Sequence, residues 1–248
     1  MTTKQAVLIL GESPLVEEYA SLCHNKGFAV SLRLNAEYAK VAVPRDLKRV
    51  AKVSRSFTLA LELTNIDHES KRKNIAELDK ALGPAAIIMS SSVTVSLAEQ
   101  HSWVGRPGRL IGIGAFPSLL QNGLIEFAES SATEPPARAK AEKFSAALGK
   151  ESAFVADSVG LVLPRILSML ANEACFAMGE KVATGPDIDT AMKLGTNYPA
   201  GPVEWAGKIG VRQVYAVIQA MYKASKEDRY RPSPLLTLAA RRNSLLGS

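Results

Sequence analysis

The 248-residue chain carries 30 Lys and Arg residues against 24 Asp and Glu residues, a net charge of +6, and 47% of its residues are hydrophobic. This composition is typical of a globular protein, and the length allows one large domain or two smaller ones. Because the basic residues are scattered, the charge excludes nucleic acid as a partner and suits a small anionic ligand. No apolar run approaches the roughly 20 residues that span a bilayer, and no secretory leader is recognisable. We therefore expect a cytoplasmic protein without a membrane partner.

Strands and helices alternate as far as about residue 156. Short apolar runs predict strands at 6–10, 28–34, 57–61, 85–89, 110–113, 124–127 and 154–155. Helices are predicted over 68–82 and 132–148, so the alternation favours a mostly parallel sheet with helices on both faces. From residue 157 the pattern changes to helices separated by Gly and Pro, beginning with a long apolar helix over 159–178. We predict an α/β domain over 1–156 and an all-helical domain over 157–248.

The first predicted strand leads into Gly11, a polar turn and a helix. This is the context of a Gly-x-Gly-x-x-Gly dinucleotide-binding turn, but Ser13 and Val16 stand at the second and third glycine positions. Ser13 adds a side chain where the backbone should approach a pyrophosphate, and Val16 adds bulk at the helix–strand contact. Pro14 removes an N–H group at the helix start, where anions are normally bound.

The second predicted strand ends in Arg33, Leu34 and Asn35, where a dinucleotide site would place an acidic residue on the ribose hydroxyls. Arg33 is a candidate for contact with a 2′-phosphate, and a solvated arginine is the alternative. The candidate cofactor-binding residues are Gly11, Ser13, Val16, Arg33 and Asn35. Because this set is degenerate, we expect NAD or NADP to bind weakly, or no cofactor to bind; no metal site is expected.

The helical half contains "TGPDIDTAMKLGTNYPAGPVEWAGKIG" at 184–210. Pro186, Asp187 and Asp189 favour the start of a helix, and "YPAGP" turns the chain into the next one. This motif closely resembles the C-terminal domain of 3-hydroxyacyl-CoA dehydrogenases. The resemblance extends over nearly the whole chain, through "ESKRKNIAELDKALGPAAIIMSSS", "GRLIGIGAFPS", "GLIEF", "DSVGLVLPRILSMLANEA" and "YRPSPLLTLAARR".

The resemblance implies a Rossmann-type, NAD-binding-like first domain and a second domain similar to the C-terminal domain of 6-phosphogluconate dehydrogenase. It also implies an oxidoreductase of fatty acid metabolism, similar to 3-hydroxybutyryl-CoA dehydrogenase, that dimerises through its helical domain. The last helices contain more apolar residues than a small helical domain can bury by itself, namely Val214, Ile218, Met221, Leu235 and Leu238. We therefore predict a homodimer formed through the C-terminal domain.

The resemblance also assigns the catalytic positions. In the family, a His in a "GLHFFNP" motif is the general base, and a Glu twelve residues later orients it. In this chain the base position is Gly114, and Glu126 stands in the place of the orienting residue. The family's Ser and Asn that contact the reacting oxygen correspond to Val93 and Pro164. Three of these four positions therefore carry residues whose side chains neither exchange a proton nor donate a hydrogen bond.

Few other residues are candidates for a replacement base. The histidines are predicted at helix ends away from the cleft, in surface or capping roles, at His24, His68 and His101. Hydroxyl groups lie nearer the cleft and are interpreted as turn and helix-capping groups, at Ser90, Ser91, Ser92 and Thr94. Glu126 is the remaining candidate for a replacement base, although we prefer to interpret it as a carboxylate with a structural role.

We interpret the chain as a pseudoenzyme, or as a diverged binder of acyl-CoA or another anionic ligand. The alternative is an active, divergent NAD(P)-dependent oxidoreductase that acts on 3-hydroxyacyl-CoA or a related hydroxy acid. Its base would be Glu126 or a water held by the serine cluster. A third possibility is a structural subunit of an active paralogue. Cys23 and Cys175 are interpreted as buried free thiols of a reducing compartment.

Overall fold

The computed structural model describes residues 5–44, 46–244 and 246, so the outermost ends of the two expected domains lie outside it. The chain is divided into two compact units between Leu161 and Val162, and the short segment Phe116–Ser118 belongs to the second unit. None of the described helices is both long and apolar enough to span a bilayer.

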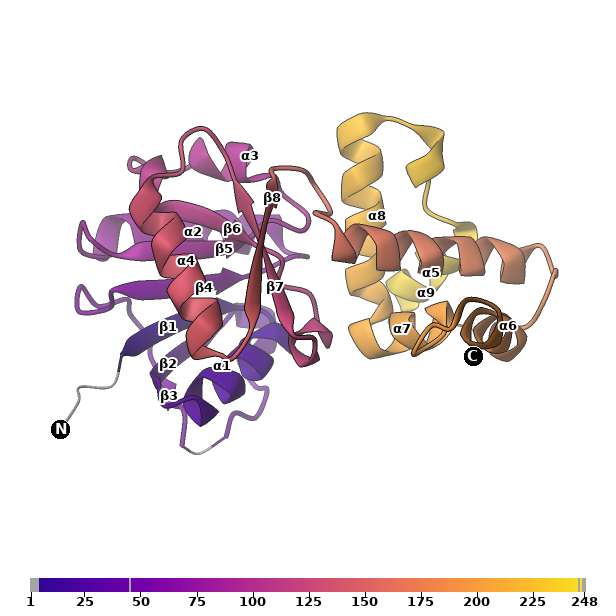
Figure 1. The fold of residues 1–248 in the computed structure, drawn as a ribbon, viewed down its shortest axis with the longest axis horizontal. Helices are drawn as coiled ribbons and strands as arrows, with labels where there is room; N and C mark the ends of the chain where they lie inside the picture. Colours follow the sequence, from indigo (N-terminus) through magenta and orange to yellow (C-terminus); the bar gives the residue numbers. More distant parts are fainter. Residues whose placement is uncertain (1–4, 45, 245, 247–248) are drawn as a thin grey trace. The chain divides into compact units, whose positions relative to one another are not determined.

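The first unit is built on one sheet, which has eight strands among the described residues, in the order β3-β2-β1-β4-β5-β6-β7-β8 (Figure 1). The strands are β1 Ala6–Gly11, β2 Ala29–Leu34, β3 Lys48–Arg49, β4 Leu59–Leu63, β5 Ile87–Ser91, β6 Leu110–Ile113, β7 Leu124–Glu129 and β8 Glu151–Ala156. Neighbouring strands are parallel except β6 and β7, which are antiparallel. The predicted α/β class with a mostly parallel sheet is confirmed.

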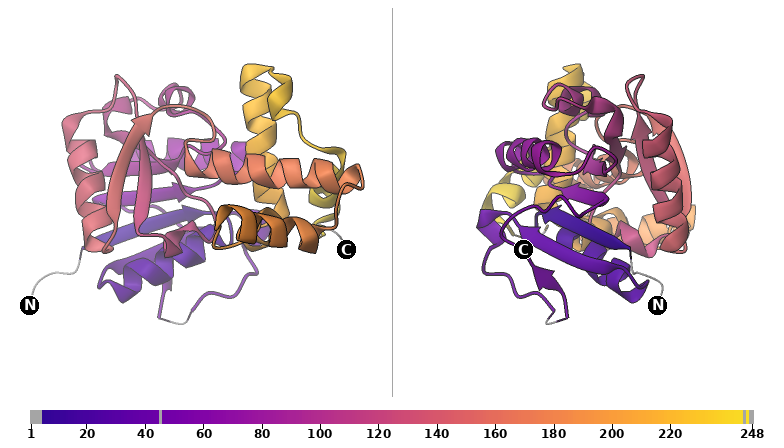
Figure 2. Two further views of the ribbon diagram at one scale, coloured as in Figure 1. Left: turned by 45° about the vertical axis from the view of Figure 1, so that its right-hand side comes forward. Right: turned by 90° about the vertical axis from the view of Figure 1, so that its left-hand side faces the viewer.

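Helices cover both faces of this sheet. The α-helices are α1 Leu15–Asn25, α2 His68–Ala81, α3 Leu97–His101 and α4 Pro135–Ala147, and short 3-10 helices lie at η1 Ala36–Tyr38, η2 Pro107–Arg109 and η3 Leu119–Gln121. Successive side chains of β1 point to opposite faces of the sheet and so enter two different hydrophobic cores. Val7 and Ile9 pack in the core with α1 and α4, whereas Leu8 and Leu10 pack in the core with α2 and α3. Figure 2 shows α2 and α4 on opposite sides of the sheet.

The described residues after Ala156 contain helices and no strand, which confirms an all-helical C-terminal domain. These helices are α5 Leu163–Gly179, α6 Gly185–Thr196, α7 Pro202–Ile209, α8 Val211–Ser225, η4 Asp228–Tyr230 and α9 Pro234–Arg242. Val214, Ile218 and Met221 of α8 are at most 2% exposed within this single chain. The domain therefore buries three of the five apolar residues that were expected to exceed its core, whereas Leu235 is half-buried and Leu238 is 44% exposed.

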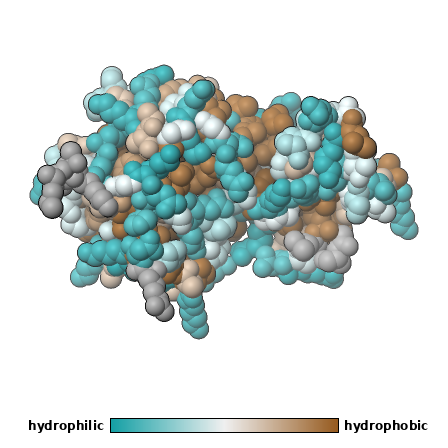
Figure 3. Space-filling model, turned by 60° about the horizontal axis from the view of Figure 1, so that its bottom comes forward, coloured by the Kyte–Doolittle hydropathy of each residue, from teal (hydrophilic) through white to brown (hydrophobic). Residues whose placement is uncertain are grey.

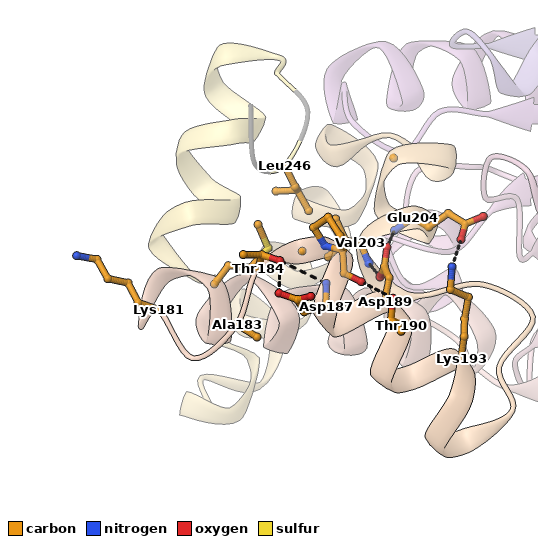
Figure 4. A pocket seen from close by; sticks show the side chains of 14 residues that line it. Lys181, Ala183, Thr184, Asp187, Asp189, Thr190, Lys193, Val203, Glu204 and Leu246 are labelled. Atoms are coloured by element: carbon orange, nitrogen blue, oxygen red, sulfur yellow. Dashed lines mark hydrogen bonds and ion pairs between the residues drawn. The ribbon is translucent and has the colours of Figure 1, made fainter.

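The junction between α6 and α7 depends on an aspartate that the sequence analysis placed at the start of its own helix. Asp187 does lie in the first turn of α6, where the Thr184 hydroxyl donates to it over 2.5 Å. Asp189 instead accepts hydrogen bonds from the backbone N–H groups of Val203 and Glu204, at 2.8 and 3.0 Å, and so caps α7 (Figure 4). A Cβ at Gly201 would overlap this carboxylate, so the glycine of "YPAGP" is required by the cap.

Gly11 at the end of β1 has a φ of +143°, and a Cβ built there would lie 2.5 Å from the backbone oxygen of Leu63. We expect Gly11→Ala to lower the free energy of unfolding by about 3 kcal/mol or more, because backbone strain and a backbone overlap add up. Urea unfolding followed by circular dichroism measures the change.

Gly27→Ala is the matched control, because Gly27 has a φ of +86° but open space around its Cβ position. This substitution should cost only about 1 kcal/mol, the usual penalty for a left-handed residue. Equal losses for the two variants would contradict the assignment of a close approach between β1 and β4.

Candidate functional site

The order of the strands changes direction between β1 and β4, and ligands of wound parallel sheets bind at the carboxyl ends of the strands at such a point. The turn after β1 lies there and is held on both sides. The backbone N–H of Glu12 donates to Leu63 at the end of β4 over 3.2 Å, and the N–H of Asn35 donates to Gly11 over 2.7 Å. The backbone of this turn is therefore fixed between the ends of β2 and β4.

Glu12, which the sequence analysis did not single out, is the most deeply buried group of this turn. Its side chain is 0% exposed, and its two carboxylate oxygens accept hydrogen bonds from the backbone N–H groups of Asn65 and Ile66, at 3.0 and 3.1 Å. The carboxylate thus joins the turn after β1 to the turn after β4. In the sequence, the only indication of this role is that an acidic residue directly follows the first glycine of the turn. The glycine spacing of the turn does not reveal where that side chain points.

The other residues of the turn differ in burial. Ser13 is half-buried, Pro14 is exposed as the residue that precedes α1, and Val16 is completely buried in the core between α1 and the sheet. Of the three glycine positions of the expected fingerprint, the first is occupied by a glycine, Gly11. Its positive φ and the close approach of the Leu63 backbone leave no room for any other residue there.

The sequence predicts that Arg33, near the end of β2, is either solvated or in contact with a 2′-phosphate. In the structure its side chain instead contacts residues of α2. Its guanidinium forms an ion pair with Glu77 of α2 at 2.6 Å and donates to Asn74 at 3.4 Å. The hydrogen bonds from Arg33 hold the pKa of the Glu77 carboxyl below its ordinary value. Asn35 is engaged too, because it donates to Thr64 at 3.0 Å and accepts from Asn74 at 2.9 Å.

A buried ion pair lies below these residues. Lys71 of α2 and Glu62 of β4 are both 0% exposed and 2.6 Å apart. Lys71 also donates to the backbone oxygen of Thr64 at 3.0 Å, while Ser90 and Asn74 donate to Glu62 at 3.1 and 3.3 Å. Because both charges have several polar partners, the pair satisfies the conditions under which a buried ion pair is tolerated.

The serine cluster at the end of β5 and just beyond it is part of the interior and does not cap a helix as expected. Its members are at most 5% exposed: Ser90, Ser91, Ser92 and Thr94. Ser91 donates to the side chain of Asn65 over 2.5 Å, and Thr94 donates to the backbone oxygen of Asn65 over 2.6 Å. The cap of α3 is Ser96.

His68 lies closer to this edge than the sequence analysis expected. It begins α2 after the turn that follows β4, and its Nε2 atom is 3.2 Å from the hydroxyl oxygen of Thr94. The other histidines have structural partners. His24 is 2.9 Å from Asp46, and His101 bridges the backbone oxygen of Leu110 and the hydroxyl of Ser130.

Gly114 and Glu126, the expected positions of the base and its orienting residue, are direct neighbours. The N–H of Gly114 donates to the backbone oxygen of Glu126 over 2.8 Å, and a Cβ at Gly114 would lie 3.1 Å from the Cβ of Glu126. Glu126 is 8% exposed. Val93 is completely buried, and Pro164 is buried in the first turn of α5 in the second unit. Among the described residues, no group of three or more His, Cys, Asp and Glu side chains is placed to hold a metal ion.

The second unit contains a hollow of about 1000 Å³ beside α6 and α7 (Figure 4). Part of its polar lining holds the two helices together. Asp189 caps α7, and Glu204 lies 3.6 Å from Lys193 and 2.7 Å from Lys208. These ion pairs hold the pKa of the Glu204 carboxyl below its ordinary value, chiefly through the hydrogen bond from Lys208. The hollow therefore presents paired charges of both signs.

Comparison with known proteins identifies the family. Residues 23–158 match the NAD binding domain of 3-hydroxyacyl-CoA dehydrogenase, and residues 160–245 match its C-terminal domain. The chain belongs to the 3-hydroxyacyl-CoA dehydrogenase family. The resemblance seen in the sequence is confirmed. The matched part of the NAD binding domain begins at residue 23, so the turn after β1 precedes it.

Relatives of the chain carry names within the same family. A 3-hydroxybutyryl-CoA dehydrogenase of Bradyrhizobium diazoefficiens is 32% identical over 222 residues, which cover 88% of this chain and 75% of that protein. The crystal structure of (S)-3-hydroxybutyryl-CoA dehydrogenase from Ralstonia eutropha has a TM-score of 0.78 and 25% identity, and covers 97% of this chain and 94% of its own. That of FadB2 from Mycobacterium tuberculosis has a TM-score of 0.85 at 21% identity, with 99% and 96% covered.

The buried pair Lys71–Glu62 can be tested by substitution. We expect Lys71→Met to lower the free energy of unfolding by about 3–5 kcal/mol, because Glu62 then becomes an uncompensated buried charge. Chemical unfolding of the purified protein measures this loss.

Lys73→Met is the matched control on the same helix, because Lys73 pairs with Glu69 at 2.6 Å while its side chain is 72% exposed. Its removal should leave the unfolding midpoint within experimental error. A small effect of Lys71→Met would show that Glu62 finds another partner, and the network would then not depend on this ion pair.

Proposed function

We propose that this chain has lost the 3-hydroxyacyl-CoA dehydrogenase reaction and retains the fold as a binder of acyl-CoA or another anionic ligand. The observation that carries the proposal is the contact between Gly114 and Glu126. The carboxylate residue that would orient the base is buried beside Gly114, whose backbone N–H is 2.8 Å from the Glu126 backbone oxygen. Gly114 itself carries no group that could accept a proton.

The chemistry of the family explains why this loss is decisive. Oxidation of a 3-hydroxyl group by hydride transfer also requires removal of the hydroxyl proton, and a positioned base typically contributes about 10²–10⁴-fold to such a step. Hydrogen-bond donors at the reacting oxygen contribute a further factor. Val93 and Pro164 offer no side-chain donor at the positions where the family has Ser and Asn.

The proposal extends to the cofactor. The family binds NAD through the first domain, but we propose that this chain binds NAD or NADP weakly. Ser13 and Val16 replace two glycines, Arg33 is held by Glu77, and Leu34 stands where an acidic residue would contact the ribose. These residues of the turn and the second strand do not fit a dinucleotide, so no step of a reaction is assigned to one.

One observation favours a second candidate function, an active but divergent NAD(P)-dependent oxidoreductase. His68 lies at the carboxyl edge of the sheet, 3.2 Å from the Thr94 hydroxyl, and histidine is a residue type that serves as a general acid or base. In this candidate function, His68 or Glu126 would replace the family's base for a 3-hydroxyacyl-CoA or a related hydroxy acid.

We further propose a homodimer formed through the second unit, or pairing of that unit with an active paralogue. The support comes from large hydrophobic side chains that this unit leaves exposed, with Val182 at 73% and Leu194 at 83%. Hydrophobic groups also reach the surface on the face drawn in Figure 3.

We also propose that the protein is located in the cytoplasm, and the state of its two cysteines supports this location. Cys23 and Cys175 are free and buried, and burial raises the pKa of their thiols to about 12 and about 11.

The activity test follows NADH oxidation with acetoacetyl-CoA. We expect turnover well below about 1 s⁻¹, the lower range of typical enzymes, because the proton-transfer group is missing. Thermal denaturation with coenzyme A and acetoacetyl-CoA serves as the companion measurement. A ligand at 100 times its dissociation constant should add about 2.7 kcal/mol of stability even where no turnover occurs.

Turnover at about 1 s⁻¹ or faster would contradict the proposal and favour the second candidate. His68→Ala and Glu126→Gln then identify the base, because loss of the base lowers kcat by about 10²–10⁴-fold. His24→Ala is the matched control, since His24 lies in an exposed pair with Asp46.

The assembly is tested by multi-angle light scattering. We expect a particle of twice the 26.6 kDa chain mass, and we expect Leu194→Asp to convert it to monomers, because a charge would replace an apolar contact. Leu124→Asp, on a 40% exposed leucine of the first unit, should leave the dimer intact. A wild-type mass near 26.6 kDa would refute the homodimer.

A further inference from the structure

We propose that Ser130 is a nucleophilic serine, which His101 activates and which accepts the acyl group of a thioester. The register of β6 and β7 pairs Gly112 with Ala128, and its continuation places Ser130 opposite Leu110. Leu110 is the first residue of β6, which runs in the same direction as β1, β4 and β5. The pair therefore lies at the edge of the sheet opposite the turn after β1, and the inference goes beyond the proposed function.

The hydrogen bonds of His101 determine which of its ring nitrogens carries the proton. Nε2 is 3.1 Å from the backbone oxygen of Leu110, and Nδ1 is 3.1 Å from the hydroxyl oxygen of Ser130. Because a backbone oxygen can only accept, Nε2 carries the proton and donates it to Leu110. In the neutral imidazole Nδ1 is then an acceptor, so the Ser130 hydroxyl donates to it. A hydroxyl group bonded to a base, which a third group orients, is the arrangement of an activated nucleophile.

The turn after β7 fixes the position of the Ser130 hydroxyl oxygen. The backbone N–H of Ala132 donates to this oxygen over 3.1 Å. The N–H of Ser130 donates to the Thr133 hydroxyl over 3.1 Å, and the N–H of Thr133 donates to the Ser130 backbone oxygen over 3.1 Å. A hydroxyl oxygen has two lone pairs, and Ala132 uses one of them. The second lone pair can therefore attack while the proton points at His101.

The pair lies at the surface of the first unit, where an acyl donor can reach it. Ser130 and His101 are half-buried, and the residues that follow Ser130, which are Ser131 and Ala132, are exposed. At the other edge of the sheet, by contrast, Ser91 is completely buried. A hydroxyl group that is both reachable and bonded to a base is therefore present at position 130.

The reaction is an acyl transfer without oxidation or reduction. The Ser130 oxygen attacks the carbonyl carbon of the thioester, so a C–O bond forms and the C–S bond breaks. The hydroxyl proton passes to Nδ1 of His101 and from there to the departing thiolate. A positioned base contributes about 10²–10⁴-fold to such a step. We expect the lower end of this range, because a neutral backbone oxygen stabilises an imidazolium less than a carboxylate does.

The test uses the full-length protein and S-acetyl-N-acetylcysteamine, a thioester without a nucleotide. Release of the thiol gives the rate, and mass spectrometry of peptides locates the acetyl group. We expect acetylation of Ser130 about 100 times faster than that of the exposed Ser131. Ser130→Ala and His101→Gln should abolish this excess. Ser102→Ala is the matched control, because this exposed hydroxyl beside His101 donates to the backbone oxygen of Glu99 over 2.6 Å. Equal thiol release by wild type and Ser130→Ala would overturn the inference.

A cysteine at the same position gives an independent measurement. The natural thiols of Cys23 and Cys175 are buried, and burial raises their pKa to about 12 and about 11, so they react slowly. We expect iodoacetamide to alkylate Ser130→Cys about tenfold or more faster than Ser131→Cys, because a neighbouring histidine favours the thiolate. Adding His101→Gln to Ser130→Cys should remove the difference.

The two cysteine variants decide the question even where His101→Gln does not fold, since both retain the histidine. Equal alkylation of the two variants would show that the bond between Ser130 and His101 is structural, and the inference would be wrong. Neither measurement uses NADH or coenzyme A. Failure of this inference therefore leaves the proposed function untouched, and failure of the proposed function leaves these rates unchanged.

Discussion

The end of β1 lies so close to the end of β4 that no side chain fits between them. Gly11 is paired in register with Leu63, and a Cβ at Gly11 would lie 2.5 Å from the Leu63 backbone oxygen. The same contact sets the position of the following residue, because the N–H of Glu12 donates to Leu63 as well. The first glycine of the turn is therefore needed for the fold itself. The second and third glycines of a dinucleotide site serve mainly the ligand and the helix packing, and here their positions carry Ser13 and Val16.

Contacts among its own residues hold the polar interior of the first unit together. Lys71 and Glu62 neutralise each other at 2.6 Å, and Asn74 connects Glu62 to Asn35. Ser91 is joined to Asn65 in the same way. A buried network that is satisfied internally stabilises the carboxyl edge of the sheet without a cofactor. The fold of this edge is therefore compatible with the proposed loss of the reaction.

The apolar pattern of the sequence was sufficient to predict the class of fold, because buried strands such as Leu110–Ile113 are continuous apolar runs. It did not reveal β3, since Lys48 and Arg49 are exposed and pair only through their backbone. Side-chain partners were harder to predict, because they lie far apart in the chain. Arg33 reaches Glu77, 44 residues away, and Asp189 reaches the start of the next helix. No local pattern encodes the direction of such a side chain.

Neighbouring side chains fill the space beside Gly114, the position where the resemblance places the base. Leu161 is 3% exposed, and its Cδ1 atom would lie 3.3 Å from a Cβ at Gly114. Leu161 has a φ of +48°, a conformation that costs a branched side chain free energy and persists where the surroundings hold it. A histidine at position 114 would have to displace Leu161 and the Cβ of Glu126, which lies 3.1 Å from the same point. A histidine side chain at position 114 therefore requires room as well as an imidazole, and a single substitution at Gly114 does not provide that room.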